Sequence, residues 1–345
     1  MKIEVAPVAT GEEIRTIAFA IELAAFFNGE VRVDSIEWDI DPLTDWYINS
    51  EVAEEERDAY LEERQQAEDE AREATLSRLV SVFKERSKSL GAVYPLELDL
   101  ENGVLLRRVE NFACVPQVAC YIWLALFRAS HSAYECLIVD GESRSKIHSH
   151  FKNVFELIAA FSAIGQFPGY AWYLGSSRDV KKLLRRLGYV THRVGSGVVK
   201  NIDAMDINQV NDNDGGVDVL LYRQGQVPII HLVGATIQKQ QRKNKIMGQR
   251  EKERFRRFFQ NNINLPLQGI LAIPFEKSEV DALNCAEEDC LYFHAENIID
   301  SLGMVSSYEP AKYRHLGLQL RDKTIGGLRD LSLDEADVIK DCFAA

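Results

Sequence analysis

Carboxylates and glycines gather in one short stretch of this 345-residue chain, directly before a β-branched run. The stretch reads Asp214-Gly215-Gly216-Val217-Asp218 and leads into a short apolar segment. A second apolar segment, Ile229 to Ile237, follows after a turn and ends in Gln238-Lys239. Carboxylate oxygens bind hard cations such as Mg²⁺, and the two segments are typical of hairpin strands. We therefore expect a metal site where the acids at the start of the first strand lie near Gln238 and Lys239 at the end of the second.

Counting positions excludes several common motifs. If Gly216 were the sharp-turn residue of an EF-hand, position twelve of the loop would be Tyr222, where a bidentate Glu is required. The chain also lacks a GxxxxGK[ST] loop, a GxGxxG fingerprint and a GxSxG elbow. Nucleotide-dependent and serine-hydrolase chemistry are therefore disfavoured. Six cysteines without a CxxC pair indicate reduced, mostly buried thiols rather than a zinc site.

What remains is Asp218 at the start of a strand, paired across a hairpin with a second strand that runs toward polar residues. One reaction for which such residues are suited is phosphodiester cleavage with a divalent cation. That reaction needs carboxylates to hold the ion, and a lysine or a second ion to favour hydroxide formation and neutralise charge on the phosphate. The arrangement resembles the PD-(D/E)xK superfamily of restriction-endonuclease-like nucleases, and DGGVDVLLYR is similar to the DGGxD form of Mrr-like members. The resemblance covers roughly residues 151–302, because GILAIPF and CLYFHAENIIDSL also fit such domains.

The resemblance implies specific roles for residues of this chain. Asp218 would be the main ligand of Mg²⁺ or Mn²⁺, with Asp214 as a possible supporting acid. Glu156 matches the extra helical acid that many members of the superfamily contribute. Gln238 and Lys239 would supply the catalytic residues of the second strand.

The second strand departs from the family pattern. The expected acid and lysine would fall near Val233 to Thr236, where the sequence is Val-Gly-Ala-Thr. Period-two alternation puts Gln238 and Lys239 on opposite faces, so they cannot replace the motif in a regular strand. A β-bulge, or a lysine from the start of the next helix, would restore the site. An intact nuclease, a degenerate member that keeps the fold for DNA binding or assembly, and an unrelated chain all remain open.

Helices and strands alternate around this hairpin. The sequence predicts helices at 151–164 and 177–187, a long basic helix from about 243 to 261, strands at 269–275 and 290–294, and a helix at 295–302. This order is typical of an α/β layer sandwich with a mixed sheet. We predict a restriction-endonuclease-like domain at 150–345, separated by a polar stretch, 140–149, from an α/β N-terminal domain at 1–140.

The N-terminal domain is predicted from capping, turn and charge patterns. Thr10 to Glu13 fits the capping box of a helix that ends near Asn28. Asn102-Gly103 predicts a type I′ hairpin. Residues 51–88 form a long, mostly polar helical pattern whose acidic part, 51–75, is either a solvated arm, a docking surface for a basic protein partner, or an acidic DNA mimic.

Charge is spread unevenly along the chain. The formal net charge of −13 would repel nucleic acid if it were uniform, but residues 239–257 are strongly basic. In this stretch the residues expected to contact DNA phosphates are Lys243, Lys245, Arg250, Arg254 and Arg257. His231 lies in an apolar strand and is predicted to be a core residue rather than a ligand.

The sequence thus predicts a metal-dependent DNA phosphodiester hydrolase, and the resemblance implies a role in bacterial defence against foreign DNA. The alternative is a catalytically degenerate nuclease-fold subunit that binds DNA or a partner protein. The N-terminus lacks the pattern of a secretion signal, and the most apolar run, Val118 to Phe127, is about half the roughly 20 residues that span a bilayer. We expect a cytoplasmic protein without membrane contact, and a homo-oligomer is left open.

Overall fold

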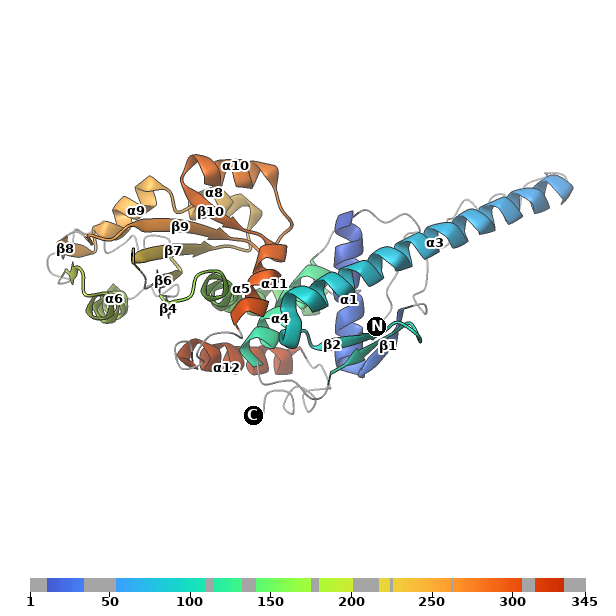
Figure 1. Ribbon diagram of the computed structural model, residues 1–345, viewed down its shortest axis with the longest axis horizontal. Helices are drawn as coiled ribbons and strands as arrows, with labels where there is room; N and C mark the ends of the chain where they lie inside the picture. Colours follow the sequence, from blue (N-terminus) through green and yellow to red (C-terminus); the bar gives the residue numbers. More distant parts are fainter. Residues whose placement is uncertain are drawn as a thin grey trace. The chain divides into compact units, whose positions relative to one another are not determined.

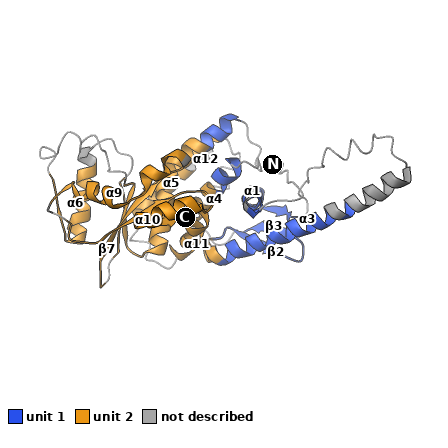
Figure 2. Ribbon diagram, turned by 90° about the horizontal axis from the view of Figure 1, so that it is seen from above, with its two compact units in different colours: residues 1–88, 94–111, 125–147 blue, residues 89–93, 112–124, 148–345 orange. Residues whose placement is uncertain are grey.

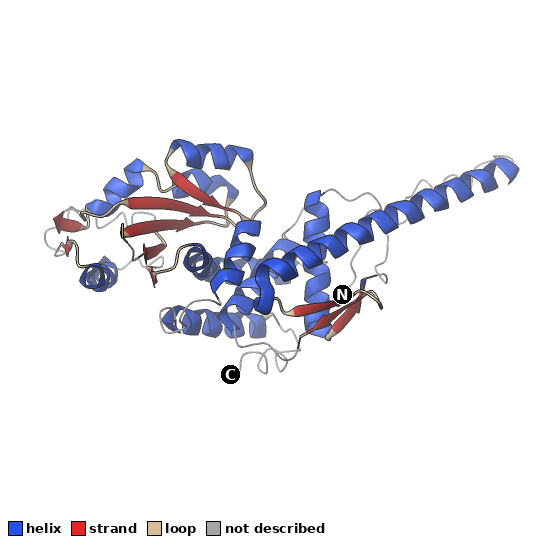
Figure 3. Ribbon diagram, in the orientation of Figure 1, coloured by secondary structure: helices blue, strands red, loops and turns tan. Residues whose placement is uncertain are grey.

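The computed structural model describes residues 11–33, 54–108, 115–131, 141–174, 180–200, 217–223, 226–261, 263–305 and 314–331. The chain is a mixed α/β protein in which helices alternate with short strands (Figures 1 and 3). It divides into two compact units: unit 1 comprises residues 1–88, 94–111 and 125–147, and unit 2 comprises residues 89–93, 112–124 and 148–345 (Figure 2). Two segments that precede the predicted boundary, 89–93 and 112–124, therefore belong to unit 2.

Unit 1 is built on two helices and a small antiparallel sheet. Helix α1 (Gly11–Asn28) is apolar over most of its length and largely buried, and it ends at Gly29, whose φ of 88° suits glycine. Helix α3 (Glu54–Leu90) carries the predicted acidic pattern. The sheet has the strand order β1-β3-β2, with bounds Glu30–Arg32, Val104–Arg107 and Leu96–Asp99. The predicted helix and hairpin are thus confirmed, whereas Thr10 lies outside the described residues.

A buried ion pair joins α1 to α3 inside unit 1. Glu22 and Arg86 are each 1% exposed, and Arg86 Nη1 donates to Glu22 Oε2 at 2.6 Å. Tyr94 Oη donates to the other carboxylate oxygen at 2.6 Å, and Arg86 Nη2 donates to the Arg15 carbonyl oxygen at 3.0 Å. Because both carboxylate oxygens have donors, the buried charge of Glu22 is well compensated.

The hairpin of unit 1 does not use the predicted type I′ turn. A type I′ turn needs positive φ at both central residues, but only Gly103 has one, at 63°, and Asn102 does not. Asp99 and Val104 close the loop, and the Asp99 carboxylate accepts hydrogen bonds from the Glu101 amide and from the Asn102 amide and side chain. The Asp99 side chain therefore sets the turn, and its bonds to Asn102 lower the pKa of Asp99.

Unit 2 contains a five-stranded mixed sheet with the order β10-β9-β7-β6-β4. In chain order the strands are β4 (Tyr170–Tyr173), β6 (Val219–Arg223), β7 (Ile229–Ala235), β9 (Leu267–Ala272) and β10 (Cys290–Phe293). Strands β4, β6 and β7 are antiparallel, whereas β7, β9 and β10 are parallel. The predicted hairpin is confirmed, with Val219 opposite Val233.

One face of this sheet packs on α6 (Val180–Val194) and α9 (Gln249–Arg256). Leu220 and Tyr222 of β6, together with Leu232 of β7, belong to the same buried cluster as Leu187 of α6 and Phe255 of α9. These strand residues share a face because they are two apart or directly opposite one another.

The other face of the sheet carries His231, which is buried and stacks on Phe167 with ring centroids 4.4 Å apart. Phe167 directly follows α5 (Gly141–Gln166). Gly165 lets α5 approach α11 (Ala295–Val305), because an added Cβ there would lie 1.8 Å from the Ser301 carbonyl oxygen. His231 is therefore a core residue, as predicted.

The predicted basic helix from 243 to 261 is wrong as a single element. The chain instead forms a 3₁₀ turn η5 (Lys239–Gln241), helix α8 (Arg242–Lys245), helix α9 and strand β8 (Phe259–Asn261). β8 pairs with β5 (Val198–Val199). The break between α8 and α9 arises because residues 246–248 leave the helix to bury Ile246 and Met247.

The polar stretch 140–149 is not a linker loop. From Gly141 onward it forms the first turns of α5, and the division between the two units falls inside that helix, between Ile147 and His148. The other described helices are η2 (Gly91–Val93), α4 (Val115–Ser130), α10 (Glu279–Glu287) and α12 (Arg314–Asp330). Among the helices that the structure describes, none is both long enough and apolar enough to cross a bilayer.

Candidate functional site

The candidate site is centred on Asp218, at the mouth of strand β6. The Asp218 amide donates to the Val233 carbonyl oxygen of β7 at 2.9 Å, and its own carbonyl oxygen accepts from the Leu174 amide, just after β4, at 2.9 Å. The backbone of Asp218 is thus held from both neighbouring strands. Its side chain is 2% exposed, so the position of the carboxylate is fixed by the sheet.

Two groups bind the Asp218 carboxylate. The Ala235 amide, at the end of β7, donates to Oδ2 at 2.7 Å. Lys245 Nζ donates to Oδ1 and Oδ2, each at 2.8 Å, and the Lys245 side chain is 22% exposed. A charge-assisted pair of this geometry compensates the buried carboxylate, while Lys245 keeps part of its surface open to solvent.

Two glycines allow the chain to bring Lys245 over the sheet. A Cβ on Gly234 of β7 would lie 2.4 Å from the Lys245 carbonyl oxygen and 2.9 Å from Met247 Cε. A Cβ on Gly269 of β9 would lie 2.1 Å from the Met247 carbonyl oxygen. Any larger residue at either position would collide with the backbone of 245–247. The Val-Gly-Ala-Thr sequence, which lacks the expected acid and lysine, thus contains the glycine that admits a lysine from the following helix.

Glu156, Tyr173 and Lys323 surround Asp218 from other elements. Tyr173 ends β4, and burial followed by its interaction and hydrogen bond with Glu156 of α5 raises the pKa of Tyr173. Lys323 of α12 donates to the Asn153 carbonyl oxygen at 2.7 Å, and its ammonium lies 5.2 Å from the centroid of the Tyr173 ring. Burial lowers the pKa of Lys323, and the charge of Glu156 opposes that shift. Three elements therefore converge on one cluster of acids, amines and a phenol.

The charge state of Asp218 is finely balanced. Burial raises the pKa of Asp218 to about 7, Lys245 opposes this shift, and the negative charge of Glu156 adds to it. Groups whose pKa lies near neutrality are concentrated at functional sites. The repulsion between Asp218 and Glu156 also means that a bound cation would stabilise both carboxylates.

The residues predicted for the second strand come after that strand has ended. β7 ends at Ala235, and the Gln238 amide donates to Thr236 Oγ1 at 3.1 Å in the loop that follows. Lys239 begins η5, and its side chain lies outside the described part of the structure, as does the whole of Asp214. The structure brings together Asp218, Glu156 and Lys245.

The residues predicted to contact phosphate occupy different environments. Lys243, Arg250 and Arg257 are exposed, Arg254 is partly buried, and Lys245 binds Asp218. Two neighbouring cations are used inside the fold: Arg242 forms an ion pair with Asp281, and Lys252, 4% exposed, donates to the Asp289 backbone and carboxylate at 3.1 and 3.2 Å. The basic stretch is therefore less available to an anion than its sequence indicates.

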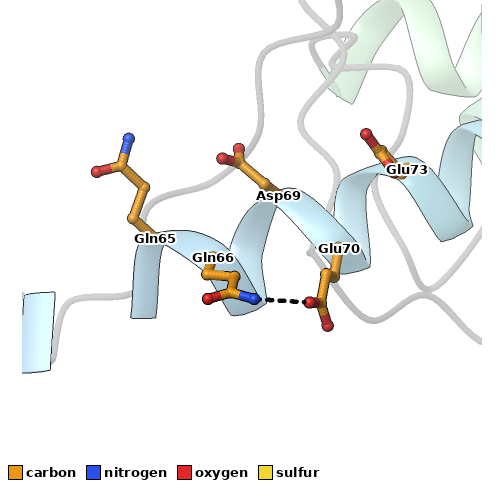
Figure 4. Close-up of a pocket in the computed structure, with 5 residues that line it drawn as sticks. All are labelled: Gln65, Gln66, Asp69, Glu70 and Glu73. Atoms are coloured by element: carbon orange, nitrogen blue, oxygen red, sulfur yellow. Dashed lines mark hydrogen bonds between the residues drawn. The ribbon is translucent and has the colours of Figure 1, made fainter. Parts of the chain in front are cut away.

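A shallow depression lies on the polar part of α3, outside this site. Its lining side chains, shown in Figure 4, are all exposed: Gln65, Gln66, Asp69, Glu70 and Glu73. Gln66 Nε2 donates to Glu70 Oε1 at 3.2 Å along the helix. The lining comes from successive turns of a single helix, which is typical of a solvated surface. A protein partner for the acidic segment 51–75 stays a prediction.

Within the described residues, no group of three or more His, Cys, Asp and Glu side chains is placed to hold a metal ion. Two carboxylates nevertheless fit a hard cation, because Mg²⁺ is usually bound through one or two carboxylates together with waters and substrate phosphates. Asp218 and Glu156 form such a pair, close enough for the charge of one to raise the pKa of the other. No family model, curated protein or solved structure matches the chain.

Proposed function

We propose that unit 2 is a metal-dependent phosphodiester hydrolase that cleaves DNA and adopts a restriction-endonuclease-like fold. The observation that carries the proposal is the contact of Lys245 Nζ with both oxygens of the buried Asp218 carboxylate, each at 2.8 Å. An acid at the start of one strand, paired with a lysine that reaches it from beyond the next strand, reproduces the donor set that this chemistry needs.

The order of elements also supports the proposal. Helix α5 supplies Glu156, the antiparallel strands β4, β6 and β7 follow, and the chain then passes through short helices into the parallel strand β9. This is the expected order of helix, strands, helix and strand, except that α6 lies between β4 and β6 and that short helices replace the single helix predicted at 243–261. The lysine comes from the helix after the second hairpin strand, which is the replacement that the missing strand motif calls for.

Each residue of the cluster has a distinct task in the proposed reaction. Asp218 and Glu156 would hold the divalent cation, which when bound supplies Lewis acidity and lowers the pKa of a water molecule. The Lys245 ammonium would stabilise the negative charge that develops on the phosphate oxygens. Tyr173, whose pKa is raised, stays protonated at neutral pH and can donate a hydrogen bond beside Glu156.

A cleavage assay with isosteric variants tests this assignment. Asp218→Asn and Lys245→Met should each reduce Mg²⁺- or Mn²⁺-dependent cleavage of single- and double-stranded circular DNA by about 10²-fold or more, because each removes a charge at the reacting centre. Lys243→Met is the matched control: Lys243 is an exposed lysine of the same short helix. Its loss should change the rate by only a few-fold.

The second candidate function is a catalytically inactive nuclease-fold subunit that binds DNA or a protein. It is favoured by Ala235, which donates to the Asp218 carboxylate from β7 but offers no acidic side chain there. If wild-type protein binds DNA but shows no cleavage above that of Asp218→Asn with either metal, the inactive subunit is the correct assignment.

A further inference from the structure

Helix α6 presents a basic and aromatic face to solvent. Its sequence contains no Asp or Glu, and its cations are Lys181, Lys182, Arg185, Arg186 and Arg193. Arg185, Tyr189 and Arg193 are four residues apart, so they lie along one side of the helix, and all three are exposed. Tyr189 is 62% exposed. A large aromatic side chain is thus held in solvent between two guanidinium groups, over about 12 Å of helix.

The neighbouring strand β4 carries two partly buried aromatic residues that pack against the buried cluster under α6. β4 is an edge strand of the five-stranded sheet, and Tyr170 and Trp172 project from the same face of it. Their rings stack with centroids 6.3 Å apart and an angle of 28° between planes. The Arg193 guanidinium lies 4.2 Å from the centroid of the Tyr170 ring and also donates to the Tyr170 hydroxyl. Arg193 therefore connects the stripe on α6 to the partly buried aromatic pair of β4.

The same strand leads to the candidate site. Tyr173 ends β4 about 10 Å along the strand from Tyr170, and it hydrogen-bonds Glu156. Arg186 of α6 donates to the carbonyl oxygen of Leu174, and the Leu174 amide donates to the Asp218 carbonyl oxygen. A ligand lying along α6 would therefore have one end near Leu174, whose backbone is hydrogen-bonded to Asp218.

We propose that Arg185, Tyr189 and Arg193 of α6 form a track that binds single-stranded nucleic acid, with Tyr170 of β4 holding the Arg193 guanidinium in place. Guanidinium groups bind the phosphates, while aromatic side chains stack on bases. Stacking requires unpaired bases, since in a duplex the base faces are covered by neighbouring base pairs. This inference rests on the proposed function for what happens at Asp218, and it names the substrate as a single-stranded or locally unwound segment.

Binding can be measured without catalysis. The full chain carrying Asp218→Asn, in the presence of a chelator, is titrated against fluorescein-labelled oligothymidylate and oligouridylate of about 20 nucleotides, longer than a typical single-strand site. Tyr189→Ala should weaken binding by about 5- to 100-fold, whereas Tyr189→Phe should keep it, because only the former removes a stacking ring. The two oligomers show whether DNA, RNA or both are bound.

The salt dependence gives a second readout. Each phosphate contact on a single strand contributes about 0.7 to the slope of log K against log salt. The double variant Arg185→Gln/Arg193→Gln should therefore lower that slope by about 1.4. Lys84→Gln/Lys88→Gln is the matched control: it removes two exposed charges spaced four residues apart on α3. The control should leave the slope unchanged.

Several results would overturn the track. The track is contradicted if Tyr189→Ala leaves oligomer binding unchanged, or if a blunt duplex binds as tightly as the single strand. It is also contradicted if the slope of log K against log salt changes in Arg250→Gln/Arg257→Gln, on the other basic segment, but not in Arg185→Gln/Arg193→Gln.

Hydrolysis of bis(p-nitrophenyl) phosphate with Mn²⁺ separates this proposal from the catalytic one, because that small substrate does not need the track. If Asp218→Asn abolishes metal-dependent hydrolysis but the α6 substitutions leave oligomer binding unchanged, the track is refuted and the catalytic assignment stands. Binding that depends on α6 without any metal-dependent hydrolysis refutes the catalytic assignment alone.

Discussion

At the scale of single residues, Asp218 should make the stability of the protein depend on pH. Its pKa is about 7 in the folded chain, raised by burial from an ordinary value of 3.8. The folded state therefore holds a proton that the unfolded state has released between about pH 4 and pH 7. In this range the free energy of unfolding should fall as pH rises, because the buried side chain must become charged.

Asp218→Asn removes this titration while keeping an acceptor for the Ala235 amide. As the pH rises from about 5 to about 8, the free energy of unfolding of the wild type should fall by about 1–3 kcal/mol relative to that of the variant. The size follows because one pKa unit corresponds to about 1.4 kcal/mol. Urea denaturation followed by tryptophan fluorescence at the two pH values measures the difference. A gap between variant and wild type that is equal at both pH values would contradict the raised pKa.

At the scale of elements, the close crossing of residues 245–247 over β7 and β9 should be intolerant of a side chain. Gly234→Ala places a Cβ 2.4 Å from the Lys245 carbonyl oxygen, so the segment must move. We expect a loss of about 1–3 kcal/mol in unfolding free energy, as for other overpacked sites. The proposed DNA cleavage should fall as well, because Lys245 would be displaced from Asp218.

Gly188→Ala provides the matched control for this prediction. Gly188 lies within α6, and a Cβ there meets nothing within 4 Å. Alanine should stabilise the helix by about 0.5–1 kcal/mol and leave cleavage unchanged. Thermal melts and the DNA cleavage assay on both variants check the pair. A Gly234→Ala protein with wild-type stability and activity would show that Lys245 does not depend on this crossing.

The sequence predicted most elements of unit 2 and left open a lysine from the next helix, but it did not single out Lys245 as the partner of Asp218. The apolar pattern was sufficient to predict strands β6 and β7, and the DGGxD stretch identified Asp218 as the candidate metal ligand. The alternation argument then treated the strand as continuing to Lys239, whereas it ends at Ala235. Lys245 reaches Asp218 only because Gly234 and Gly269 come to lie on neighbouring strands, and this proximity depends on the pairing of β7 with β9. The spacing of residues along one chain does not contain that information.

At the scale of the whole molecule, the division into two units predicts that a destabilising substitution in one unit leaves the other unit folded. The Glu22 carboxylate is buried in unit 1 and compensated by Arg86 and Tyr94, which are 64 and 72 residues away in sequence. An acid inside an apolar helix signals that a partner exists, but the sequence alone does not identify it. Glu22→Gln keeps the shape and leaves the Arg86 charge buried without its counter-ion, which costs about 3–5 kcal/mol.

Hydrogen exchange measured by mass spectrometry locates that loss. Glu22→Gln should reduce protection in α1, β3 and residues 54–88 of α3, all in unit 1, while β6, β7 and β9 of unit 2 keep theirs and DNA cleavage is retained. Glu97→Gln is the control: Glu97 is an exposed acid of the same unit. Its substitution should leave exchange unchanged in both units. If Glu22→Gln lowers protection equally in the two units, they unfold as one cooperative body, and unit 1 contributes directly to the stability of the Asp218 cluster.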